Sequence, residues 1–416
     1  MRISRRRALA NLGGGAALAS LSPLLSCAPG GGPGESGSER IRVRERQSGA
    51  PGLELILGRS NEIFPRHSEG DLVQLSDGRL LAVWSRFSGA SDHARSQIVG
   101  RYSEDMGQSW GPIHPVASLS EPEHAANSNL MSASLLRLSG TEEIQLFYMG
   151  KEETEPENPA FHRKIRSSIH TRVSQDGVNF SKPVRLSDRD HYYVTNNARV
   201  LQLSSGRILV PSAVALDPGK ELGWEKQSAL AHYSDDGGKT WTRGESCTLR
   251  REDYPGHEYW QITLQEPGLV ELTDGRILMV NRTKLNHPYK CFSSDSGVTW
   301  SDPEPIREIV APTSPQTLFR LPSGRLAMIY NNNPKGAEAK WTERRPLAFA
   351  VSEDEGNSFR YAKTIEEVEG RCWAYHSVRI YGENVYLLYY EWHQGHPTFF
   401  FCDKKLSIIP VEWFES

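Results

Sequence analysis

The residues of this chain best suited to chemistry are arginines and carboxylates near predicted turns. Glu266 and Arg282 stand sixteen residues apart around a turn that contains Gly275. This spacing would bring both side chains to the same end of a hairpin. Arg86 precedes Asp92 by six residues, in a loop after a predicted strand. Because a guanidinium holds a carboxylate with two hydrogen bonds and stays charged at any working pH, such arginines could bind an acidic small molecule.

The elements that must position these residues are predicted to be β-strands. Short apolar runs such as 80–84 and 385–390 are bounded by Gly, Asp and Ser turns, which is typical of strands. Long segments with a period of 3.6 are absent. Six turns, four of them with a clear Gly-Arg step, would each join two strands; they lie at residues 75–80, 138–140, 203–208, 272–277, 321–326 and 381–384.

A second pattern, a serine, an aspartate two places on and a closing aromatic residue, occurs five times. The copies begin at residues 103, 174, 234, 293 and 352 and so recur every 59 to 71 residues. A fixed period of this kind indicates a repeat architecture. With six hairpins, it predicts an all-β fold, a six-bladed β-propeller of four-stranded antiparallel blades, over residues 41–416. The sixth unit lacks a box, so we expect residues 399–409 and 40–57 to complete it.

The Ser and Asp of each box can satisfy backbone groups of a tight turn, while the aromatic residue packs between strands. We therefore expect the boxes to be structural, with no catalytic role.

Residues 1–26 are predicted to be an export signal. The run Ser4-Arg5-Arg6-Arg7 before a mild apolar stretch resembles a twin-arginine signal, and Leu24-Leu25-Ser26-Cys27 is similar to a bacterial lipobox. A Gly/Pro/Ser-rich tether follows, residues 27–40. This predicts a periplasmic or cell-surface lipoprotein whose membrane contact is a lipid on Cys27. The alternative is an ordinary cleaved signal with a chance cysteine.

Charge and cysteine content narrow the class of protein. The chain has 48 basic and 51 acidic residues, a net charge of −3, which argues against a nucleic-acid partner. The other cysteines, Cys247, Cys291, Cys372 and Cys402, have no paired metal-ligand spacing. These four cysteines could form two disulfides or could be four buried free thiols. We expect no metal, no cofactor and a monomer.

The Asp-box propeller resembles the sialidase (neuraminidase) superfamily from about Asn61 to the C-terminus. Because this fold also carries other functions, the match depends on site residues. Four segments are similar to the family's: Glu266 with Arg282; Tyr375-His376-Ser377 with a later Leu-Tyr-Tyr-Glu; Arg344 or Arg345 before Pro346, with the register favouring Arg344; and Arg86 with Asp92.

The resemblance implies a role for each residue. Tyr375 would be the nucleophile assisted by Glu266, and Asp92 the acid/base. The carboxylate clamp would comprise Arg86, Arg282 and Arg344. Apart from the resemblance, the position of Gln265, directly before Glu266 and a predicted strand, makes it a further candidate for substrate binding. A neutral tyrosine suits a substrate whose own carboxylate would repel a carboxylate nucleophile. The implied activity is a retaining exo-α-sialidase that releases a terminal acidic sugar from a sialoglycoconjugate or other glycan.

The opening of the first unit departs from the family. The position expected for the first clamp arginine, counted back from Gly78, is Ser68, and Arg66 is out of register by two. Either Arg66 replaces it through a local bulge, or Glu69 faces the axis and the clamp is incomplete. This leaves three alternatives open: hydrolysis of another acidic or neutral glycan, a lyase-type elimination, and glycan binding without turnover.

Overall fold

The apolar runs form β-strands throughout the described chain, and the predicted all-β class is confirmed. The structure is a computed structural model that describes residues 40–154, 164–189, 191–215, 227–393 and 401–416. The predicted export signal, residues 1–26, and the tether except its last residue lie outside these ranges. Among the described residues, no helix has both the length and the apolar character needed to cross a bilayer. One α-helix, α1 (Val411–Glu415), follows the last strand.

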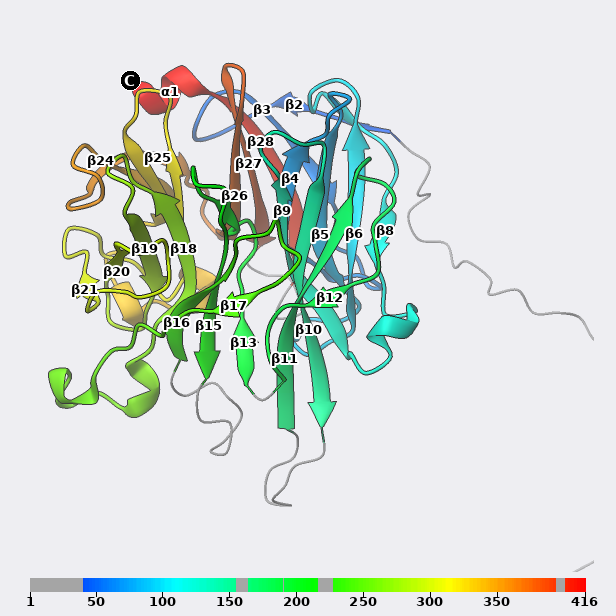
Figure 1. Ribbon diagram of the computed structural model, residues 1–416. Coiled ribbons are helices and arrows are strands. Elements are labelled where there is room, and N and C mark those ends of the chain that lie inside the picture. The colour runs from blue at the N-terminus through cyan, green and yellow to red at the C-terminus, as the bar shows by residue number, and fades with distance from the viewer. Residues whose placement is uncertain (1–39, 155–163, 190, 216–226, 394–400) are drawn as a thin grey trace, which may run out of the picture. The chain divides into compact units, whose positions relative to one another are not determined.

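Two separate sheets each have four antiparallel strands in sequence order. The strands of the first are labelled in Figure 1. The first contains β18 (Gln265–Glu271), β19 (Ile277–Arg282), β20 (Tyr289–Ser293) and β21 (Glu304–Pro305). The second contains β22 (Thr317–Arg320), β23 (Leu326–Asn331), β24 (Leu347–Ser352) and β25 (Arg360–Glu366).

A nine-stranded sheet contains two antiparallel groups that are joined by one parallel pair, Ser167 with Tyr192. The first group is β9 (Asn129–Arg137), β10 (Ile144–Thr154), β11 (Lys164–Ser174) and β12 (Val184–Arg185). The second is β13 (Tyr192–Val194), β14 (Leu201–Gln202), β15 (Ile208–Ala215), β16 (Gln227–Ser234) and β17 (Thr242–Arg243).

Another nine-stranded sheet is built in the same way, and its two groups are joined by the parallel pair Cys402 with Arg66. One group is β4 (Arg66–Gln74), β5 (Leu80–Phe87), β6 (Ser96–Ser103) and β8 (His114–Ala117). The other is β26 (Arg371–Tyr381), β27 (Asn384–His393), β28 (Cys402–Pro410), β3 (Leu53–Gly58) and β2 (Arg44–Glu45). The N-terminal segment therefore adds a strand beside β28, as the sequence predicts.

The remaining elements are short. Strand β1 (Ile41–Arg42) pairs with β7 (Ser109–Trp110). In the described part of the chain, 3-10 helices occupy Pro122–His124, Arg251–Asp253, Tyr259–Gln261, Gly336–Glu338 and Trp341–Glu343.

Five strands, which we call the inner strands, pack against one another: β4, β9, β18, β22 and β26. Three of them surround a buried carboxylate. Strand β4 lies against β9 and β26, and β22 lies against β18 and β26. Asp71, fully buried on β4, accepts hydrogen bonds from Ser377 Oγ and Arg379 Nη2 on β26, each at 2.6 Å, and from the Leu135 N–H on β9 at 2.8 Å. One side chain thus connects three strands.

All five Asp boxes share one hydrogen bond. In each, the serine hydroxyl donates to the aspartate Oδ1 at 2.8–2.9 Å. In the box that begins at Ser293, the same hydroxyl also accepts the N–H of Gly297 at 2.8 Å. Gly297 has a φ of 88°, a left-handed conformation that glycine adopts without strain. The boxes are therefore built as turns, as predicted.

This geometry predicts a stability effect for Ser293→Ala. The variant leaves a buried N–H unpaired and removes one partner of Asp295, so we expect the free energy of unfolding to fall by about 1–2 kcal/mol. Denaturant titration would measure it. The neighbouring exposed Ser294 provides the control Ser294→Ala. Equal midpoints for the two variants would contradict the structural role of the box.

Candidate active site

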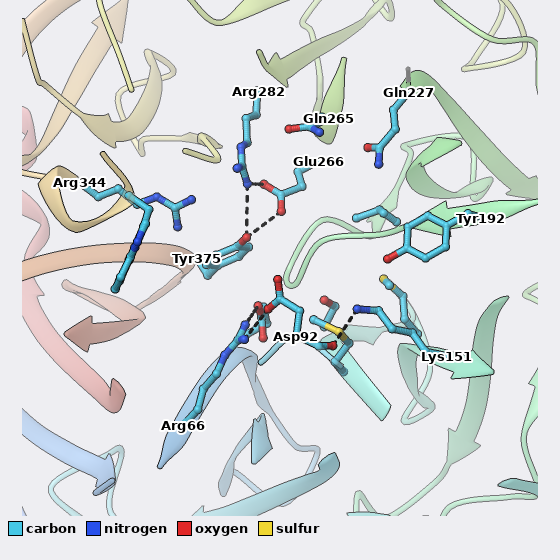
Figure 2. A pocket seen from close by; sticks show the side chains of 16 residues that line it. Arg66, Asp92, Lys151, Tyr192, Gln227, Gln265, Glu266, Arg282, Arg344 and Tyr375 are labelled. Atoms are coloured by element: carbon cyan, nitrogen blue, oxygen red, sulfur yellow. Dashed lines mark hydrogen bonds and ion pairs between the residues drawn. The ribbon is translucent and has the colours of Figure 1, made fainter. Parts of the chain in front are cut away.

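A cavity of about 370 Å³ brings together eight of the nine predicted site residues. They come from the inner strands β4, β18 and β26, from the end of β19, from the loop after β5 and from the segment before β24. Figure 2 shows most of them pointing toward one another. The eight are Arg66, Glu69, Asp92, Gln265, Glu266, Arg282, Arg344 and Tyr375.

A tyrosine, a glutamate and an arginine form a hydrogen-bonded group on one side of this cavity (Figure 2). The Tyr375 hydroxyl donates to Glu266 Oε1 at 2.8 Å, and Arg282 Nη1 donates to Glu266 Oε2 at 2.7 Å. Arg282 Nη1 also lies 3.4 Å from the Tyr375 oxygen. Burial and the Glu266 carboxylate raise the pKa of Tyr375 well above its ordinary value, so its hydroxyl is neutral.

Backbone irregularities aim these side chains into the cavity. The pairing of β18 with β19 shifts register around Glu266, and that of β26 with β27 shifts around Tyr375. Both residues have left-handed φ values, 45° and 57°, which are uncommon for residues other than glycine. Bulges redirect side chains out of the regular alternation of a strand, at a cost in backbone strain.

The same device occurs at Ser132 on β9, which lines the cavity, has a φ of 62° and lies where the register with β10 shifts. The backbone around Tyr375 is also held from a neighbouring segment, because Asn197 Nδ2 donates to the carbonyls of Tyr375 at 3.1 Å and Gly70 at 2.7 Å.

Arg344 places a positive charge at the cavity. Among the described residues, no carboxylate contacts its guanidinium. Its Nη1 donates to the Tyr390 hydroxyl at 2.8 Å and its Nη2 to the Thr313 carbonyl at 3.1 Å. Its guanidinium lies 5.8 Å from the centre of the Tyr375 ring. Its neighbour Arg345 borders a different hollow, so it is Arg344 of the two that lines this cavity.

Arg66 reaches the cavity through a bulge and is shared by two carboxylates. The pairing of β4 with β5 shifts register between His67 and Gly70. Arg66 Nη2 lies 3.0 Å from Glu69 Oε1, and its Nη1 is in close contact with Asp92 Oδ1. Arg66 therefore reaches the cavity beside a bulge, as the first alternative for this segment expects, and Glu69 also lines the cavity.

The protonation of Asp92 is set by these cationic neighbours. Burial alone would raise the pKa of Asp92, but Arg66 and Lys151 outweigh that effect and hold it well below its ordinary value. Asp92 is therefore ionised when the cavity holds no ligand.

The prediction that Arg86 belongs to the clamp is corrected by its position. Its guanidinium lies over the Phe64 ring, 4.0 Å from the ring centre, and it borders a separate hollow. The next residue, Phe87, packs against Arg66, whose guanidinium carbon lies 4.3 Å from the centre of the Phe87 ring. Because successive residues of a strand face opposite sides, Arg86 points away from the cavity and Arg66 supplies the third guanidinium there.

Lys151 is a cavity residue that the sequence analysis did not select. The residue is 2% exposed, and its Nζ donates to the main-chain carbonyl of Asp92 at 2.9 Å. Asn129 Nδ2 donates to the same carbonyl at 2.8 Å. Tyr192 and Gln227 line the same side, opposite Tyr375 (Figure 2). One sequence signal could have indicated Lys151: it directly follows the mostly apolar stretch 144–150, and a charge next to buried residues needs a partner.

The residues of this cavity could bind an anion next to a tyrosine hydroxyl that is paired with a carboxylate. Three guanidiniums and an ammonium border one small cavity, together with a hydroxyl whose proton a carboxylate can accept. No group of three or more His, Cys, Asp or Glu among the described residues is placed to hold a metal ion. The four cysteines that the structure describes are buried thiols.

Comparison with known proteins gives one family and distant relatives. A family model described as a BNR repeat-like domain matches residues 73–387. The chain is 23% identical over 398 residues to a sialidase of Micromonospora viridifaciens, which covers 88% of this chain and 55% of that protein. The chain spans about half the length of the curated relatives that it matches.

Two solved structures are similar in fold. A protein of unknown function from Dyadobacter fermentans has a TM-score of 0.66 at 17% identity, covering 88% of this chain and 98% of that chain. The Trypanosoma rangeli sialidase has a TM-score of 0.61 at 16% identity, covering 92% of this chain and 61% of that chain. At these identities the likeness shows the fold alone.

The environment of Lys151 predicts a pH effect on stability. Burial lowers its pKa from 10.5 to about 8, against the opposing effect of Asp92. Between these two values the unfolded chain binds a proton at Lys151 that the folded protein does not, so this residue makes folding more favourable as pH rises. From pH 8 to 10.5, wild type should gain on the order of 3 kcal/mol relative to Lys151→Met.

Denaturant titrations of both proteins between pH 7 and 10.5 would test this. The exposed Lys239→Met serves as the control, because it should follow the wild type at every pH. A constant difference between wild type and Lys151→Met would show that Lys151 titrates normally.

Proposed function

Because the chain belongs to the BNR repeat-like family of the sialidase superfamily, we propose that it is a retaining exo-α-sialidase-type glycoside hydrolase. It would release a terminal acidic sugar from a glycan. The observation that carries this proposal is the 2.8 Å hydrogen bond from Tyr375 to Glu266 in a cavity with three guanidiniums.

The proposed nucleophile is the Tyr375 oxygen. A neutral hydroxyl does not repel the carboxylate of the sugar, as a carboxylate nucleophile would. Glu266 accepts the hydroxyl proton as the oxygen attacks the anomeric carbon, which gives a covalent sugar–tyrosine intermediate. Arg282 Nη1, 3.4 Å from the tyrosine oxygen, stabilises negative charge that develops there.

The substrate carboxylate would bind among Arg66, Arg282 and Arg344. Arg344 supports this assignment most directly, because its hydrogen-bond partners Tyr390 and Thr313 are neutral. Asp92, across the cavity from Tyr375, would protonate the leaving oxygen and then deprotonate the water that releases the sugar. Two successive displacements at the anomeric carbon give net retention.

We also propose that the sheets form a six-bladed propeller of four-stranded antiparallel blades. Each nine-stranded sheet would be two blades, in contact through its single parallel pair. The way in which the inner strands pack against one another supports this arrangement.

The protein would be exported through its twin-arginine-type segment and would be a monomer held at the periplasmic or cell-surface side by a lipid on Cys27. The sequence of residues 4–27 supports this part of the proposal.

Substitution of the hydroxyl and carboxylate tests the mechanism. We expect Tyr375→Phe to lower kcat/KM for an aryl α-sialoside by at least about a thousandfold, and Glu266→Gln by about 10² to 10⁴-fold, because each removes part of the nucleophile pair. Tyr361→Phe, at a tyrosine that is 49% exposed, should keep wild-type activity.

Proton NMR of the first product distinguishes retention from inversion, since it records which anomer of the sugar appears before mutarotation. Full activity in Tyr375→Phe, or a β-anomer as first product, would refute the mechanism.

A further inference from the structure

The ion pair between Arg66 and Asp92 conflicts with the role that the proposed function gives to Asp92. A general acid must carry a proton at the working pH, but the contact with Arg66 favours the ionised carboxylate. The same arginine belongs to the proposed clamp for the substrate carboxylate. Two anions, Asp92 and the sugar, therefore compete for one guanidinium.

We propose that the carboxylate of the bound sugar replaces Asp92 on Arg66, and that the released Asp92 takes up a proton and becomes the general acid. This inference rests on the proposed function. The step breaks one ion pair, forms another and transfers one proton from solvent to Asp92, with no covalent or redox change.

Asp92, rather than Glu69, is the carboxylate that can leave Arg66. The Asp92 side chain is 38% exposed and comes from the loop between β5 and β6, whereas the Glu69 side chain is 2% exposed within β4. The main chain of Asp92 is held at its carbonyl by Lys151 and Asn129. Rotation of the Asp92 side chain about this fixed backbone is thus sufficient.

The groups around Asp92 explain why its release favours protonation. From the elements packed against it come Arg66 and Glu69 on β4, Lys151 on β10 and Tyr192 on β13, and His93 adjoins it on its own loop. After displacement Asp92 loses contact with Arg66 and faces two anions, Glu69 and the ligand carboxylate. Nearby negative charge raises the pKa of a carboxyl group.

The exchange would make the acid depend on the charge of the substrate. A neutral glycoside has no carboxylate to displace Asp92, so the Arg66–Asp92 pair persists and the acid stays ionised. Specificity for acidic sugars would then arise partly at the proton-transfer step and not only from binding in the clamp.

Calorimetry of the full-length protein tests this through the protons exchanged on binding. The probe is 2-deoxy-2,3-didehydro-N-acetylneuraminic acid, titrated at several pH values between 4.5 and 7, each in two buffers of different ionisation enthalpy. Below the pKa of Asp92 in the complex, we expect uptake of about one proton per bound ligand and an affinity that falls about tenfold for each unit of rising pH. Above that pKa, both the uptake and the slope should disappear.

Two matched comparisons isolate Asp92. The methyl ester of the probe, which lacks the negative charge, should bind to wild type without proton uptake. Asp92→Asn should bind the acid without proton uptake, whereas Asp302→Asn, at an exposed carboxylate outside the cavity, should behave as wild type.

Binding of the acid with no proton uptake by wild type, or with equal uptake by Asp92→Asn, would overturn this inference and leave the hydrolase proposal intact. Absence of both probe binding and aryl sialoside hydrolysis would instead overturn the proposed function, and this inference with it.

Discussion

The buried carboxylate of Asp71 imposes the constraint on which the site depends. A charge without solvent is costly unless hydrogen bonds and a counter-ion replace its hydration. Asp71 finds these partners only when β4, β9 and β26 are in register, since Ser377 and Arg379 come from β26 and the Leu135 N–H comes from β9. Any sliding of these strands would leave the charge unpaired, which makes the register of the inner strands strongly specified.

That register fixes the irregular backbone beside it. Tyr375 lies two residues before Ser377, and its left-handed conformation is held by two contacts: Asp71 binds Ser377 at the end of the bulge, and Asn197 binds the carbonyl of Tyr375 itself. Glu266 is placed by a comparable bulge on another sheet. The 2.8 Å hydrogen bond between them thus joins two strained positions, each maintained by its own sheet, which is how a packed structure can hold reactive groups in a fixed relation.

The sequence predicted the fold class and most of the cavity because these depend on local or repeated patterns. Gly turns and Asp boxes recur at fixed spacing, and the Glu266–Arg282 spacing matches a single hairpin. Arg86 was assigned incorrectly because the face on which a strand residue lies depends on register, and the bulge after Arg66 has no local sequence signal. Lys151 was missed because its partner, the main-chain carbonyl of Asp92, is distant in the chain and belongs to no side-chain pattern.

The pairing of β3 with β28 has a consequence for biosynthesis. Leu53 to Gly58 can add to its sheet only after the ribosome has passed Pro410, because its partner strand is made that late. Until then, the edge that β3 offers is open to association with other chains. The cavity, whose residues range from Arg66 to Tyr375, is likewise assembled from contacts of very long sequence separation, which form slowly. The nascent protein therefore has no complete site, and chaperone protection of the early strands would matter most during this interval.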